Sequence, residues 1–430
     1  MTSIIIFDST LVKFVAFSNQ ELPIVMYVWI FATILVLMIV FSTVLLISVN
    51  KSNTSKYFKG ELSLKLSYFV ICLVQVAIFA IMISIILSII LVKNYAIASL
   101  LAETYLSYIT AIFFLVVLVY TLVKWFSSNR NQTVLLYAIS FSLVCLNLVT
   151  SIIYITYQFS FHVPSVKPNS IHLYLLNLPR SDLSKPFGFM LDILSILSFV
   201  TIWISTSKLL SQYSNRLGKK RYWAIVSMPL IYFIFPFETY FGGIFHEFIV
   251  DSPVVNSIIY VLFFGATKEI GGVLFSMVFL TASTIVKVPN LRNSLIVTSI
   301  GIAIVFGSIE IDTLLYAVYP PFGLITVSII PIGTYLIYTG IFSSAKRISE
   351  DAKLRKELYR TAENQMKLLK TIGATQMEQH LMNTFRTVSK RAITFGNNEV
   401  PEPEKEEVKQ IIKDVLNELQ SRSRNKTDSK

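Results

Sequence analysis

Long apolar runs fill the first 345 residues of the chain, and short polar stretches separate them. A helix needs about 20 apolar residues to cross roughly 30 Å of hydrocarbon, and nine runs approach or exceed that length. We predict spans at approximately residues 23–49, 66–92, 97–123, 134–157, 186–207, 222–248, 254–286, 293–309 and 321–343. The pattern predicts an all-α fold, in which residues 1–345 form a polytopic transmembrane helix bundle of about nine spans.

The polar loops predict how the bundle is oriented, because cytoplasmic loops are enriched in Lys and Arg. Alternate loops carry most of the basic residues of the first 345 positions, namely Lys51, Lys56, Lys59, Lys65, Lys124, Arg130, Lys208, Arg216, Lys219, Lys220, Arg221, Lys287 and Arg292. With an odd number of spans, this places the N-terminus outside the cell membrane and the C-terminus in the cytoplasm.

Composition agrees with a membrane protein, since 54% of the residues are hydrophobic and only 14% are charged. An ordinary soluble domain carries roughly 25% charge. The net charge of +12 arises largely in short loops, where it sets topology, so we expect the lipid bilayer and no nucleic acid as a partner. Cys72 and Cys145 lie inside apolar runs without a CxxC pairing and are predicted to be packing residues, with no metal site or cofactor.

The loop at residues 158–185 is the longest between predicted spans and contains Pro164, Pro168 and Pro179. A loop of this length is often functional. It is interpreted either as an extracytoplasmic lid over the bundle or as a simple connector.

Charged residues inside predicted spans are the leading candidates for a functional site, because a charge in hydrocarbon is costly unless it is paired or hydrated. Glu238 lies in the sixth run, and Lys268 and Glu269 lie in the seventh. At 1.5 Å per residue, Lys268 and Glu238 lie at similar depths on antiparallel neighbours. The group is interpreted either as a polar centre that binds an ion, proton or small polar ligand, or as a structural salt bridge.

A second candidate group lies toward the predicted outer face of the bundle. Its members are Glu103, Asp192, His246, Glu247, Glu310 and Asp312. Together they would form an acidic vestibule that attracts cations, whereas singly each would be a solvated helix end.

No enzyme motif is present in the sequence. His246-Glu247 is followed by Phe248 and has no second His at the spacing that an HExxH zinc site requires. The chain also lacks a GxSxG elbow, a P-loop and a dinucleotide-binding glycine pattern. We therefore expect no enzymatic activity and assign no catalytic residue.

The last 85 residues differ sharply from the rest and hold half of all charged side chains. Residues 346–395 are predicted to form a charged cytoplasmic helix that continues the ninth span and carries an apolar stripe. Residues 396–430 are predicted to form a linker, an amphipathic helix and a disordered end. The apolar stripes predict association, either with a second copy of the chain in a coiled coil or with a cytoplasmic protein.

Three stretches carry a family resemblance: Tyr319-Pro320-Pro321-Phe322-Gly323, the run from Ser349 to Arg355, and Ala374-Thr375-Gln376-Met377-Glu378-Gln379. In these the chain resembles uncharacterised archaeal multi-pass membrane proteins, which are similar in architecture to the membrane sensor portion of histidine kinases. The kinase domain itself is missing. The resemblance implies a role in signal transduction and names no ligand.

These observations favour a non-catalytic membrane sensor or scaffold with a cytoplasmic helical output tail. The alternative is a membrane transporter or channel for an ion or small polar solute, which would use the polar centre of the sixth and seventh spans.

Overall fold

The computed structural model describes residues 4–5, 7–8, 11, 24–53, 62–129, 132–159, 165–166, 184–211, 218–228, 230, 267–285, 289–308 and 319–350. Ten helices and two short strands have assigned bounds in these ranges. In chain order they are α2 (Ile24–Asn53), α3 (Leu62–Val92), β1 (Tyr95–Ala96), α4 (Ile97–Asn129), α5 (Gln132–Phe159), β2 (Ser165–Val166), α7 (Ser184–Ser211), α9 (Lys219–Ser227), α12 (Thr267–Ile285), α13 (Pro289–Ser308), α15 (Leu324–Ser328) and α16 (Ile330–Glu350).

Six of the helical segments are long and apolar enough to cross a membrane, so the chain is an integral multi-pass membrane protein. They are Val25–Asn50, Leu64–Val92, Ile97–Ser127, Gln132–Tyr157, Phe189–Lys208 and Leu324–Ser344. The eighth predicted span corresponds to the shorter apolar segment Arg292–Ser308. The sixth and seventh predicted spans are described only in part, by α9 and α12, so the count of nine stays a prediction.

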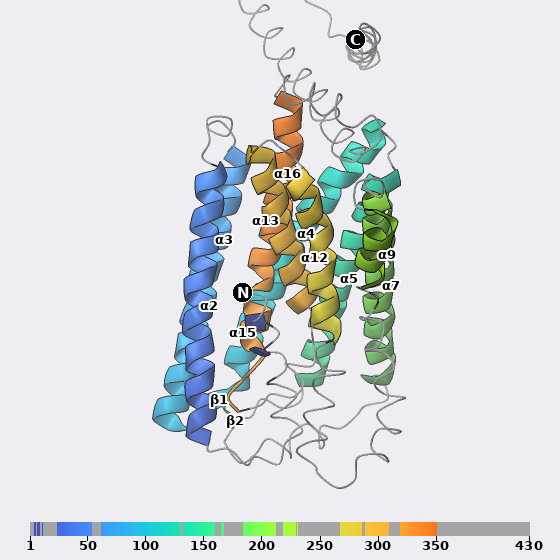
Figure 1. The fold of residues 1–430 in the computed structure, drawn as a ribbon. Helices are drawn as coiled ribbons and strands as arrows, with labels where there is room; N and C mark the ends of the chain where they lie inside the picture. The colour runs from blue at the N-terminus through green and yellow to red at the C-terminus, as the bar shows by residue number, and fades with distance from the viewer. Residues whose placement is uncertain are drawn as a thin grey trace, which may run out of the picture.

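The long helices run side by side along one axis, with α2 and α3 on one side of the bundle and α7 and α9 on the other (Figure 1). Large apolar side chains point away from the protein on the outer helices, for example Trp29 on α2, Phe69 on α3 and Tyr120 on α4. Lipid is the solvent that such a surface requires. Within the helices, Ser and Thr hydroxyl groups donate to carbonyls of the preceding turn, as Thr104 does to Leu100 at 2.9 Å, and so remain satisfied without water.

Helix α16 is the central element of the bundle. In the segment Leu324–Ser344, 94% of the most apolar stretch is buried inside the protein, compared with 33% for each of the first two spans. The helix continues to Glu350 and extends past the ends of its neighbours (Figure 1). The predicted charged helix at 346–395 stays a prediction, because α16 reaches only Glu350 and residues 351–430 lie outside the described part.

Glycines allow α16 to approach α13 closely. A side chain at Gly301 would meet the Ile337 backbone nitrogen at 2.7 Å and the Gly333 carbonyl oxygen at 2.8 Å, and one at Gly340 would meet the Thr298 nitrogen at 2.8 Å. Gly272 brings α12 against the backbone of Phe306 in the same way. Small residues at contact positions are typical of helix packing in membranes, where close backbone approach provides the packing energy.

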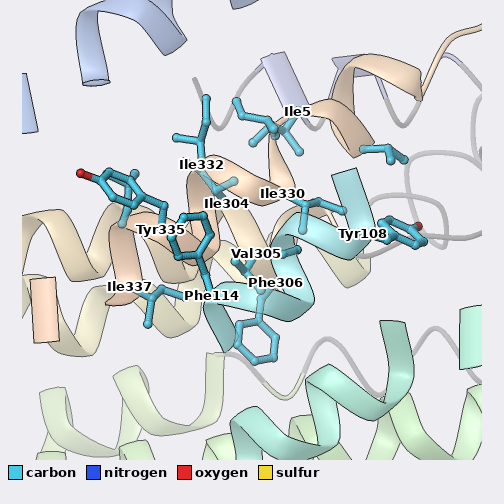
Figure 2. Packing of buried hydrophobic residues seen from close by; sticks show 14 of the residues in the cluster. Ile5, Tyr108, Phe114, Ile304, Val305, Phe306, Ile330, Ile332, Tyr335 and Ile337 are labelled. Carbon is cyan, nitrogen blue, oxygen red and sulfur yellow. The ribbon is translucent and has the colours of Figure 1, made fainter. Parts of the chain in front are cut away.

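Aromatic and aliphatic side chains fill the space around α16 (Figure 2). The Phe114 ring of α4 lies 5.5 Å from the Tyr335 ring of α16, at an interplanar angle of 65°. Ile304, Val305 and Phe306 of α13 approach from another direction (Figure 2). Buried side chains of α4 and α13 therefore pack against the central helix on two sides.

A short ladder connects two loops at the end of the bundle opposite the end of α16 at Glu350 (Figure 1). β1 and β2 pair antiparallel, with Tyr95 opposite Val166 and Ala96 opposite Ser165. The Tyr95 ring also stacks on the Tyr319 ring, with centroids 6.2 Å apart and an interplanar angle of 19°. The predicted loop at 158–185 thus pairs with β1 at Ser165–Val166, and its ends at 158–159 and 184–185 belong to α5 and α7. Residues 160–164 and 167–183, and with them the predicted lid, lie outside the described residues.

Candidate functional site

Asp8 is bound to the start of the central helical segment. Its Oδ2 accepts hydrogen bonds from the Thr326 backbone N–H at 3.0 Å and from the Thr326 Oγ1 hydroxyl at 2.9 Å. The side chain is completely buried. The other oxygen, Oδ1, is buried and accepts no hydrogen bond of good geometry from the described residues. A carboxyl group from the beginning of the chain thus contacts a helix more than 300 residues away.

The backbone at residues 319–323 explains why this carboxyl group is held there. Gly323 precedes α15 with φ of 84° and ψ of −19°, a left-handed conformation that glycine adopts without steric cost. The first N–H groups of a helix have no partner within it, and α15 has no side-chain cap from its own N-cap residue. Asp8 supplies the missing acceptor from outside the helix.

Burial raises the pKa of Asp8 from 3.8 to about 6, and hydrogen bonds from Gly323 and Thr326 partly oppose this rise. Desolvation disfavours the charged form of a carboxyl group, whereas donors that face it favour that form. Since burial is the larger effect, the pKa of Asp8 lies above that of a free carboxyl group.

Aromatic rings enclose the turn that carries Gly323. Phe322 packs edge-to-face on Phe31 and Tyr27 of α2, with ring centroids 5.7 and 6.3 Å apart. Tyr319 stacks on Tyr95, and all five residues from Tyr319 to Gly323 are buried. The turn beside the Asp8 contact is therefore enclosed by rings of α2 and by Tyr95 of β1.

Glu103 lies on the face of α4 that packs against the central helix. It precedes Phe114, which touches Tyr335, by eleven residues, or about three helical turns. Glu103 is completely buried. Its Oε1 accepts a hydrogen bond from the Ser107 hydroxyl at 3.0 Å, and its Oε2 has no hydrogen-bond partner among the described residues. Glu103 is one of the residues of the predicted vestibule, and its side chain is enclosed by protein.

Gln75 is a further buried polar residue, near the middle of α3. It is 2% exposed, and neither its Oε1 nor its Nε2 has a hydrogen-bond partner in the described part of the chain. An unsatisfied amide inside a membrane-spanning bundle is costly. Such groups are retained chiefly where they serve packing specificity or a polar pathway.

The other candidates from the sequence are less fully described. Lys268 and Glu269 lie in the first turn of α12, and Asp192 lies within α7, but their side chains are outside the described part. Glu238, His246, Glu247, Glu310 and Asp312 lie in segments that the structure does not describe. The polar centre and the vestibule therefore stay predictions. No group of three His, Cys, Asp or Glu residues suited to a metal ion occurs among the described residues.

Sequence reasoning missed Asp8 and Gln75, although each had a signal. Asp8 follows the apolar run Ile4-Ile5-Ile6-Phe7, and Gln75 is a lone amide in the second span. The rule that polar groups inside apolar runs are functional candidates would have included both if it had been extended to short runs and to uncharged residues.

Comparison with known proteins finds no matching family, no matching curated protein and no matching solved structure.

Proposed function

We propose that this chain is a non-catalytic membrane sensor or scaffold in which the central helix transmits a change from the Asp8 end of the bundle to the cytoplasmic tail. The observation that carries the proposal is the placement of α16. The segment Leu324–Ser344, which contains most of α16, is the most buried of the six candidate spans in the described part of the chain. α16 follows directly on the short helix that Asp8 caps and remains helical to Glu350.

The packing around α16 supports transmission over this length. Gly301, Gly333 and Gly340 bring the backbones of α13 and α16 close together, and Ser299 of α13 donates a hydrogen bond to the Ser276 carbonyl of α12 at 2.8 Å. Helices in such close contact shift as rigid units rather than deform. Movement at α15 would therefore be passed along α16 instead of being lost within the bundle.

The break between α15 and α16 provides a place where such a movement can begin. Ile329 separates the two helices with φ of −96° and ψ of −12°, and helical hydrogen bonding resumes with the Gly333 N–H donating to the Ile329 carbonyl at 3.1 Å. Residues at the ends of helices are the usual hinges of conformational change.

A transporter or channel is the second candidate, and one observation favours it. Glu103 of α4 and Gln75 of α3 are buried and have polar atoms without a hydrogen-bond partner among the described residues. Polar groups in membrane-spanning helices often mark ion or proton pathways. This candidate requires passage of a solute, whereas the sensor requires only movement of α16.

The two candidates are separated by two measurements on the full chain in liposomes. Spin labels at Asn129→Cys and Glu350→Cys report the distance between the ends of α4 and α16, after Cys72 and Cys145 are replaced by Ala. For a sensor, Thr326→Val shifts this distance, because it removes the hydroxyl donor to Asp8. Thr43→Val is the matched control, since the Thr43 hydroxyl donates only to Ile39 in its own helix.

The second measurement is the flux of protons and alkali cations into the same liposomes. The sensor proposal expects no flux above that of protein-free vesicles. A flux that Glu103→Gln abolishes, with no change in the label distance for Thr326→Val, would establish the transporter instead.

A further inference from the structure

We propose that the end of the bundle where α7 finishes and α9 begins binds the headgroups of anionic phospholipids. The surface formed by Lys208 and Lys219–Trp223 is called the basic corner below. This inference goes beyond the proposed function, because it concerns how the protein contacts its bilayer and requires neither signalling nor transport.

Positive charge is concentrated at the basic corner. The sequence from 208 to 222 contains no Asp or Glu, and its basic residues are Lys208, Arg216, Lys219, Lys220 and Arg221. Lys208 donates a hydrogen bond at 2.7 Å to the neutral side chain of Gln132 at the start of α5, and Lys220 is exposed.

The helices around the corner supply no opposite charge. The sequences of α5 and α9 contain no acidic residue. Asp192 of α7 precedes Lys208 by sixteen residues, or about 24 Å along the helix. Positive charge without a neighbouring carboxylate attracts anions from the surroundings.

The corner lies at the depth of the lipid headgroups. Lys208 ends the apolar segment Phe189–Lys208, so it marks the boundary of the hydrocarbon. The indole N–H of Trp203 donates to the Val226 carbonyl at 2.8 Å, and these two positions are nearly equally far along the chain from the stretch that joins α7 to α9, as in an antiparallel hairpin. Lys208 and Lys220 lie five and six residues nearer that stretch, about 7.5 and 9 Å along their helices. The two lysines therefore reach the membrane surface at about the same level.

An exposed tryptophan indicates that lipid surrounds the corner. Trp223 is 59% exposed, and it follows the exposed Lys220 by three residues, so both lie on one face of α9. Tryptophan is enriched where spans meet the headgroups, because its ring is apolar and its N–H donates hydrogen bonds. A dissolved anion would use only the charge of this face, whereas a phospholipid uses both the charge and the apolar ring.

The net charge of the headgroup determines which phospholipid the corner prefers. Phosphatidylcholine carries its own cation beside the phosphate, whereas phosphatidylglycerol has a net negative charge. Clusters of basic residues next to a membrane span favour anionic lipids. We therefore expect phosphatidylglycerol to be enriched at the corner.

The test measures quenching of Trp223 fluorescence by brominated lipids in liposomes that contain the full chain. The liposomes hold equal parts of phosphatidylglycerol and phosphatidylcholine, and only one of the two is brominated, so the surface charge is the same in both samples. Trp29→Phe removes the other strongly exposed tryptophan, and subtracting the signal of Trp223→Phe isolates Trp223. We expect stronger quenching by brominated phosphatidylglycerol. Lys208→Gln combined with Lys220→Gln should reduce this preference at least fivefold, the effect of about one basic residue near an anionic surface.

The matched control is Lys65→Gln combined with Arg292→Gln, which removes the same charge from exposed positions of α3 and α13. The control should keep the preference. If circular dichroism shows that the double variant at the corner is misfolded, Lys220→Glu replaces it and should abolish the preference.

Three outcomes would overturn the proposal. The first is equal quenching by the two lipids in the parent protein. The second is a preference that the corner and control variants lose equally, or that neither loses. The third is a preference that disappears when inorganic phosphate replaces chloride at constant ionic strength, because the corner would then bind dissolved anions.

Discussion

Two buried carboxyl groups show how much the environment of a single residue decides. Asp8 receives two donors from Thr326, whereas Glu103 receives a hydroxyl from Ser107 in its own helix. Asp8 links segments that are far apart in the sequence, so a change at Asp8 alters how elements are joined. A change at Glu103 alters chiefly the surface of α4 that faces the centre of the bundle.

The raised pKa of Asp8 predicts that its contact with α15 weakens as the pH rises. The docked carboxyl has a pKa of about 6, compared with 3.8 when free, so the docked form holds its proton more tightly. Docking is strongest below pH 3.8, declines between about pH 4 and pH 6, and stays weak above that range. The difference corresponds to roughly a hundredfold change in the docking equilibrium.

This prediction is checked by following the distance between spin labels at Phe7→Cys and Trp29→Cys, with Cys72 and Cys145 replaced by Ala, from pH 4 to pH 8. Titratable groups on the described elements near Asp8 include Tyr27, Tyr95, Glu103, Tyr108 and Tyr319. Glu103→Gln serves as the control, and the pH response should persist in it. Asp8→Asn should show no response. A docked population that grows with rising pH would contradict the assignment.

At this scale the sequence predicted some of the site and missed its main contact. Glu103 was a candidate because an acidic residue in an apolar span is conspicuous. Asp8 was overlooked because its run is too short to be a span, and because its partner Thr326 lies 318 residues away. Hydrogen bonds over such separations depend on how helices pack, and a single sequence does not reveal that.

At the scale of elements, long apolar runs in the sequence correctly predicted several helices. The runs predicted at 66–92, 97–123 and 134–157 correspond to α3, α4 and α5, which begin or end a few residues beyond them. The sequence did not indicate the interruption at Ile329 or the β1–β2 ladder. Both are set by tertiary contacts, since the apolar pattern continues through Ile329 and two-residue strands have no periodicity to detect.

The interface between α13 and α16 predicts different costs for two glycine substitutions. Gly301→Ala places a methyl group against the Ile337 nitrogen and the Gly333 oxygen at under 3 Å, and backbone atoms cannot move aside without shifting a helix. Gly333→Ala meets side-chain atoms of Ile304 and Val305, which can rotate. We expect a loss of about 1–3 kcal/mol for Gly301→Ala and a smaller loss for Gly333→Ala.

The comparison is made by measuring the unfolding of both variants in detergent. Ile304→Ala added to Gly333→Ala should recover stability relative to the sum of the single changes, because it removes the nearest methyl group. The same addition should not rescue Gly301→Ala. Equal losses for both glycine variants would show that the helices are not packed as closely as these contacts require.

For the whole molecule, the distribution of charge at the two ends of the bundle predicts its orientation. Lys65 near the start of α3, Lys124 near the end of α4, Lys208 near the end of α7 and Arg292 near the start of α13 lie toward one end. Lys208 donates a hydrogen bond to Gln132 at the start of α5 there, at 2.7 Å. The β1–β2 ladder lies at the other end (Figure 1). Since basic residues favour the cytoplasmic side, the ladder is predicted to face outward.

Cysteine labelling of intact cells tests this orientation. With Cys72 and Cys145 replaced by Ala, a membrane-impermeant maleimide should label Ser165→Cys in β2 and should not label Lys220→Cys in α9. Lys220 is exposed, so it should react once the membrane is permeabilised, which shows that its protection comes from the bilayer and not from the protein. Labelling of position 220 from outside would invert the bundle and would place Glu350 of α16, and the tail that follows it, on the outer side of the membrane.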